Sequence, residues 1–150
     1  MRFQKRDDPS EGGGKFLKLK DGQYTTGVLR GEIYEFYSKW DNGKSHLTDP
    51  LDPEGRVRFR ANLVVREEKS FQAKIWEFPL AIYNNLAALQ EAYDDLENIK
   101  IRIIRNGTGT DTTYTILPML KEPISQADLL EIKTTPLNIL EHKDASGFKT

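Results

Sequence analysis

The chain has 150 residues, of which 37% are hydrophobic and 30% charged, enough for one domain with its own core and a large solvated surface. Its formal net charge of -1 excludes a protein that is basic all over, but it is compatible with a local basic stripe. Because there are no cysteines and two histidines, disulfides are excluded and a zinc site is disfavoured. No apolar run approaches the roughly 18 residues of a membrane helix.

Residues 1–14 are polar, end in three glycines and lack the apolar segment of a secretory signal, so we expect a flexible arm. Gly14-Lys15 suggests a phosphate-binding loop, but Phe16 stands where that motif needs serine or threonine, and Pro9 stands where it needs its first glycine. We therefore expect no cofactor, and the absence of cysteine favours a reducing, intracellular setting.

Residues 16–40 are rich in strand formers and are divided by a turn at Asp21-Gly22. Gly27 and Gly31 in the second piece indicate bends or bulges, as in a long strand that curves around a barrel. Residues 41–55 contain two prolines and two glycines and are expected to form a polar loop.

Two segments with alternating polarity follow, 56–66 and 71–78, and the short link 67–70 makes them an antiparallel hairpin. In the first segment, the inward face is expected to carry Val57, Phe59, Ala61, Leu63 and Val65. In the second, we assign Phe71, Ala73 and Ile75 to the interior and Gln72, Lys74, Trp76 and Phe78 to the outer face.

Pro79 opens a predicted helix, because proline is favoured at a first helical position. Apolar residues at 82, 86, 89, 93 and 96 then recur with helical spacing. Strands are expected around 99–104 and 111–117, joined by a glycine-rich turn at 106–110. Beyond Pro118, the segment 124–132 fits a short helix capped by Ser125, and the end of the chain is expected to be disordered.

The order strand, strand, strand, helix, strand, strand predicts an all-β fold with one helix. We interpret it as a five-stranded oligonucleotide-binding (OB-fold) barrel, with the helix between strands 3 and 4. The barrel is placed at 15–120, after the arm at 1–14 and before a C-terminal extension at 121–150. A ferredoxin-like fold would need a helix in 41–55, and an SH3-like barrel has no place for the long helix.

The candidate site is the outer face of the two hairpin strands with the loops beside it. Segment 56–76 holds six basic residues against two acids, and both acids lie at the hairpin tip. Cations that follow phosphates and rings that stack on bases are what single-stranded nucleic acid requires. The candidate single-stranded-DNA-binding residues are Tyr34, Tyr37, Trp40, Arg56, Arg58, Arg60, Asn62, Lys74, Trp76, Arg102 and Arg105.

Each of these features also has a plainer interpretation. An arginine row fits a solvated strand face, Trp76 fits a position packed under the C-terminal region, and half or more of the aromatic residues at 34–40 fit the core. Catalysis is not predicted, because the adjacent acid pairs lie in the arm, at the hairpin tip and at the helix end, and no nucleophile–base or metal–carboxylate grouping is visible.

Four runs, GVLRGEIYEFYSKW, RFRANLVV, AKIWEFPLAIYNNLAAL and RNGTGTDTTYTILP, together resemble single-stranded DNA-binding proteins of tailed bacteriophages. The resemblance covers roughly residues 16–118. It implies an OB-fold protein, in the cytoplasm of an infected bacterium, that coats exposed strands during phage replication, recombination and repair with little sequence preference. Carried over by position, the groove residues would be Arg58, Arg60, Lys74, Trp76 and Arg102, with Tyr34, Tyr37 and Trp40 beside them.

The sequence departs from that family in two respects. Some members carry a zinc-binding insert, which a chain without cysteine cannot build. Many end in an acidic tail that recruits replication proteins, whereas 121–150 balances five acids with four lysines. The alternative therefore stays open that the chain is an OB-fold protein-interaction module of a replisome or virion. Pairing into a homo-oligomer through a barrel edge or the tails is equally open.

Overall fold

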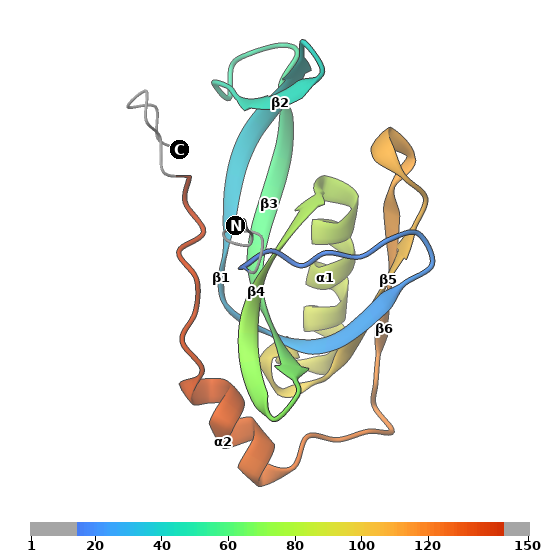
Figure 1. Cartoon of the computed structure of the whole chain (residues 1–150), viewed down its shortest axis with the longest axis vertical. Coiled ribbons are helices and arrows are strands. Elements are labelled where there is room, and N and C mark those ends of the chain that lie inside the picture. The colour runs from blue at the N-terminus through green and yellow to red at the C-terminus, as the bar shows by residue number, and fades with distance from the viewer. Residues whose placement is uncertain (1–14, 143–150) are drawn as a thin grey trace, which may run out of the picture.

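The fold, seen in a computed structural model that describes residues 15–142, is built on one antiparallel sheet of six strands. These are β1 (Tyr24–Asp41), β2 (Lys44–Leu47), β3 (Arg56–Glu67), β4 (Ser70–Pro79), β5 (Ile101–Asn106) and β6 (Thr113–Pro118). Two α-helices, α1 (Leu80–Tyr93) and α2 (Gln126–Thr134), and two 3-10 turns, η2 (Leu96–Asn98) and η3 (Gly109–Asp111), complete it (Figure 1). The predicted β-rich class is confirmed, but the predicted fold class with one helix is wrong, because the short helix expected at 124–132 also forms, as α2.

The strand β2, which sequence analysis assigned to a loop, forms because β1 ends at a tight turn. Asn42 and Gly43 both have positive φ, 53° and 75°, as the two central residues of a type I′ hairpin turn require. The turn folds Lys44 back onto Asp41 and sets the pairing of Trp40 with Ser45. An Asn-Gly pair between strand-forming residues was therefore a hairpin signal in the sequence.

The sheet is open. Five strands follow the order β4-β3-β1-β5-β6, and β2 pairs only with β1. No β4–β6 ladder closes the described part of the chain, although the rings of Trp76 and Tyr114 meet edge to face with centroids 5.6 Å apart. Residues 15–23, predicted to be largely strand, cross in front of α1 instead and make one bridge to β4 at Ile75 (Figure 1). Backbone hydrogen bonds at Leu17 and Gly22 attach this segment to β4 and to β5.

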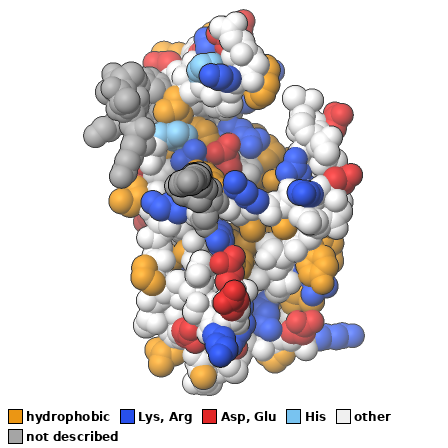
Figure 2. All heavy atoms as spheres, in the orientation of Figure 1, with side chains coloured by type: hydrophobic (Ala, Val, Ile, Leu, Met, Phe, Trp, Pro, Cys, Tyr) orange, Lys and Arg blue, Asp and Glu red, His pale blue; other side chains and the backbone are white. Residues whose placement is uncertain are grey.

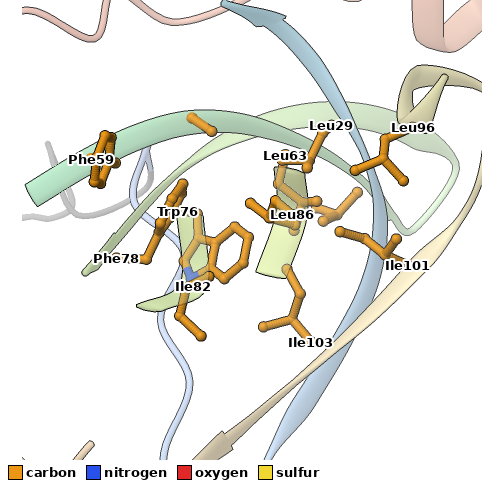
Figure 3. Packing of buried hydrophobic residues seen from close by; sticks show 12 residues of the cluster. Leu29, Phe59, Leu63, Trp76, Phe78, Ile82, Leu86, Leu96, Ile101 and Ile103 are labelled. Carbon is orange, nitrogen blue, oxygen red and sulfur yellow. The ribbon is translucent and has the colours of Figure 1, made fainter. Parts of the chain in front are cut away.

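The main core lies between the concave side of the sheet and α1. It combines the predicted inward face of β3 with apolar side chains from β4, β5 and α1 (Figure 3). Leu63, Ile101 and Ile103 are fully buried there. In α1, Ile82 and Leu86 are buried as the helical spacing predicted, and Leu96 joins the core from η2 rather than from the helix.

The two faces of β4 are the reverse of the prediction. The core holds Trp76 and Phe78, whereas Phe71 and Ala73 pack on the outer face. The register explains this, because Ala61 lies opposite Trp76 and Phe59 opposite Phe78, and directly paired residues share a face. The small Ala61 leaves room for the indole beside it.

The outer face of the sheet has a second, smaller core beneath the C-terminal residues. Val28 and Val64 pack there against Ile132 of α2, with Phe71 and Ala73 at the margin. The Ser125 hydroxyl accepts a hydrogen bond from the Asp128 N–H, which confirms the predicted helix cap. After α2, residues up to His142 run along the sheet, so the expected disorder is wrong for 135–142, and 143–150 lie outside the described residues along with the arm at 1–14.

Candidate nucleic-acid interface

The outer face of β3 carries alternate residues of the strand, which are Arg56, Arg58, Arg60, Asn62, Val64 and Arg66. The register with β1 places Ser38, Phe36 and Tyr34 opposite the first three arginines. Trp40 continues the same alternation along β1, so its side chain shares this face. The structure thus brings together the predicted arginine row and two of the predicted aromatic residues, Tyr34 and Trp40.

This face has an open end, which consists of Trp40, Arg56 and Arg58. The Trp40 side chain is 69% exposed, and Arg56 is exposed as well. Arg58 is half-buried and lies 3.5 Å from a carboxylate oxygen of Glu77. The same Glu77 carboxylate pairs with Arg60 at 3.1 Å, so one negative charge serves two guanidinium groups.

The middle of the face is covered by residues 132–142, which we call the C-terminal strap, whereas Arg66 at the far end stays exposed beside Asp128 of α2. Asn62, predicted to contact DNA, is buried: its amide donates to the Asn138 carbonyl at 3.1 Å, and its oxygen accepts from the Asn138 N–H at 2.9 Å. Arg60 donates to the carbonyl of Leu140 at 3.2 Å. The prediction that Asn62 is exposed is therefore wrong, because a buried polar group needs partners and the strap supplies them.

The strap also partly encloses two aromatic residues of β1, Tyr34 and Phe36. The rings of Tyr34 and Phe36 stack at 5.7 Å, and His142 of the strap packs against Phe36 at 4.6 Å. The guanidinium of Arg60 lies 5.3 Å from the Phe36 ring. Partial burial raises the pKa of the Tyr34 hydroxyl, and the nearby Arg60 charge opposes that shift. Tyr34 is therefore a packing partner of the strap.

Three other predicted residues lie on the opposite side of the sheet. Trp76, 1% exposed, is in the core, and the prediction that it lies outside is wrong. Lys74 faces the same way, opposite Leu63, and lies 3.2 Å from Glu67. Tyr37 pairs with Val57 and so also points away from the arginine row. These residues are not part of the open end.

The two arginines of β5 have separate roles. Arg105 ties the chain together: its guanidinium donates to the carbonyls of Leu19 and Gly107 and to the hydroxyl of Thr112. Arg102 stacks over the ring of Tyr24 at 4.4 Å, on the outer face of the β1–β5 pair. Arg105 is thus a loop anchor, whereas the half-buried Arg102 forms a cation–aromatic pair with Tyr24, which is 57% exposed.

Sequence analysis missed Arg30, Glu77 and Asn138. Arg30 lies on the same face, opposite Asn62, and donates to the Ile132 carbonyl at 2.7 Å. The alternation of β1 could have placed Arg30, but the contacts of Glu77 and Asn138 depend on register and on the strap. Figure 2 shows basic and acidic side chains interleaved on the visible face, so charge alone does not outline a site.

Neither a metal site nor a membrane span emerges from the described residues. No group of three or more His, Asp or Glu side chains is placed to hold a metal ion within 15–142. In the same range, none of the helices combines the length and apolar character needed to cross a membrane.

Comparison with known proteins found no matching family model, no significantly similar curated protein and no significantly similar solved structure.

Proposed function

We propose that the chain is a single-stranded DNA-binding protein of the OB-fold type that binds with little sequence preference. Its strand order supports this fold, since a long first strand lies between the second and the fourth of the five main strands, and the helix connects the third to the fourth. On this proposal residues 15–23 and the Trp76–Tyr114 contact take the place of a closing strand pair. Coating of exposed strands in phage replication, recombination and repair is the role that the sequence runs suggest.

One observation carries the proposal: the register sets Ser38 and Phe36 of β1 opposite Arg56 and Arg58, and the alternation of β1 puts the exposed indole of Trp40 on the same side of the sheet. Guanidinium groups and an indole on one open surface supply phosphate neutralisation and base stacking together. We place the bound strand at this open end, between the β1–β2 hairpin and the first residues of β3, because no part of the strap has to move for it to bind there.

The test is a fluorescence-anisotropy titration of labelled oligo(dT) at two salt concentrations, with RNA and duplex DNA alongside. Arg56→Ala and Arg58→Ala should weaken binding on all sequences and lower the salt slope by about 0.7 for each lost phosphate contact. Lys69→Ala is the matched control, because Lys69 is an exposed cation at the tip of the β3–β4 hairpin, away from the open end. No binding at low salt would overturn the proposal.

The second candidate, a protein-interaction module, is favoured by the strap, since hydrogen bonds at Arg30, Arg60 and Asn62 are already taken up by protein carbonyls. A partner protein that remains bound after nuclease treatment, together with no shift of labelled oligonucleotide, would favour this candidate over the first.

A further inference from the structure

A separate apolar pocket of about 300 Å³ lies between α1, η2 and the bulge of β1. Its floor is formed by Leu29 and Ala61, and its walls by Leu86 and Leu96, all four buried. The pocket exists because small residues meet there: Ala61 on β3, Ala87 on α1 and Gly31 in the bulge. Its volume is at the lower limit of small-ligand sites, which is enough for one large apolar side chain.

The bulge opens the mouth of this pocket. The pairing of β1 with β3 shifts between Arg30 and Tyr34, and Gly31 adopts a φ of +77° that favours glycine. Ile33 next to this bulge and Tyr83 of α1 both line the pocket, and each is 37% exposed. Two large apolar side chains thus stay partly in water beside an apolar cavity.

The two segments that flank the mouth are acidic in sequence, and one of their acids, Glu97, lines the pocket. Segments 31–35 and 90–98 supply five of the lining residues and contain no lysine or arginine. Their acids are Glu32, Glu35, Glu91, Asp94, Asp95 and Glu97. The one cation that lines the pocket, Arg30, pairs with Glu97 at 3.3 Å and donates to the strap, so it offsets one of these six acids and leaves the other five without a cation among the lining residues. An apolar pocket within a negative rim repels phosphates and attracts cations.

We propose that this pocket docks a segment of a partner protein that presents one large apolar side chain flanked by lysine or arginine residues. The apolar side chain fills the space above Ala61, and the flanking cations meet the acidic rim. The partner does not depend on DNA binding, because Trp40, Arg56 and Arg58 of the open end do not line the pocket.

The test is selection of a randomised twelve-residue peptide library on the full chain, followed by anisotropy with the strongest peptide. Selected peptides should share a leucine, methionine or aromatic residue flanked by basic residues. Ala87→Trp should fill the pocket and weaken that peptide more than about tenfold. Ala88→Trp is the matched control, since this neighbouring alanine of α1 is also exposed but does not line the pocket, and it should leave binding unchanged.

A charge-reversed variant tests the rim. Glu32→Lys combined with Glu91→Lys should lower affinity for the same peptide and reduce its salt dependence. Peptides without basic residues, or equal binding by the Ala87→Trp and Ala88→Trp variants, would overturn the proposal. So would self-association of the chain that Ala87→Trp abolishes, because the occupant would then be a second copy. Loss of oligo(dT) binding in the Arg56 variant with peptide binding intact would separate this proposal from the proposed function.

Discussion

The two tryptophans of the chain lie in one sheet, on strands separated by β3, and have opposite environments. Trp40 is 69% exposed beside a hairpin turn, whereas Trp76 is 1% exposed in the main core. Both stand in alternating strands with basic neighbours, so composition around them is alike. The difference comes from pairing: Trp40 follows the outer side of β1, and Trp76 is set against Ala61 on the inner side of β3. An aromatic residue in a basic strand is a ligand contact only if the register turns it outward.

The largest effect on stability should follow from truncation of the buried Trp76 side chain. Trp76→Ala removes a side chain that contacts Phe78 and Tyr114, and we expect a loss of about 3–5 kcal/mol in the free energy of unfolding. Urea denaturation followed by far-ultraviolet circular dichroism measures it. Trp76→Phe should cost less, since Nε1 of Trp76 has no acceptor among the described residues and its burial is unfavourable. Near-wild-type stability of Trp76→Ala would mean that the indole is not in the core.

A smaller effect should follow from releasing the strap. Asn62→Ala removes two hydrogen bonds to the backbone of Asn138 and one from its side chain, and should lower stability by about 1–3 kcal/mol. Hydrogen exchange should then accelerate at 136–142 while β5 stays protected. Because the bound strand is placed at the open end, oligo(dT) affinity should hardly change. A marked gain in affinity would instead move the site beneath the strap.

Much of the fold was predictable because hydrophobic alternation is strong in β3 and helical spacing is strong at Ile82 and Leu86. The faces of β4 were assigned wrongly because both sides of that strand carry apolar residues, one side for the core and one for α2. The length of the β3–β4 loop, however, predicts which residues of β4 face the core. Glu67 pairs with Ser70 across a two-residue turn, and an even number of loop residues pairs odd with even positions, so Trp76 had to face the side of Ala61.

The site was less predictable than the fold. The alternation in β3 placed Arg56 and Arg58 correctly on the outer face, but it gave no sign that residues far along the chain would cover Asn62. Coverage depends on contacts between residues 76 positions apart, and no local pattern encodes such a contact. A polar residue such as Asn62 within the apolar stretch 61–65 is a local hint, since burial requires that it find a partner.

Trp40→Ala isolates the exposed indole. We expect a loss of about 1–3 kcal/mol in oligo(dT) binding, the usual worth of a base–aromatic stack, with little change in stability because the side chain is mostly in water. Tryptophan quenching by oligo(dT) gives a second measurement. Quenching should persist in Trp76→Phe and disappear in Trp40→Phe. The reverse result would mean that Trp76, and not Trp40, stacks on the bound bases.

The smallest effect concerns the loop at 48–55 between β2 and β3, which contains Asp52. The hydroxyl of Thr48, then the N–H of Glu54 and the ammonium of Lys39, lower the pKa of Asp52 from 3.8 to about 2. Because this pKa is lower in the folded protein, the carboxylate stabilises the loop above about pH 4, and that contribution is lost as the pH falls toward about 2. Lys39 is the neighbour of Trp40 on β1, and its ammonium lies 3.2 Å from Asp52. Protonation of Asp52 at low pH should therefore weaken this ion pair beside Trp40. NMR titration of the Asp52 carboxyl carbon measures this, with Thr48→Val expected to raise its pKa and Ser45→Ala to leave it unchanged. An Asp52 pKa of 3.8 or more in the wild type would show that the loop is not held in this way.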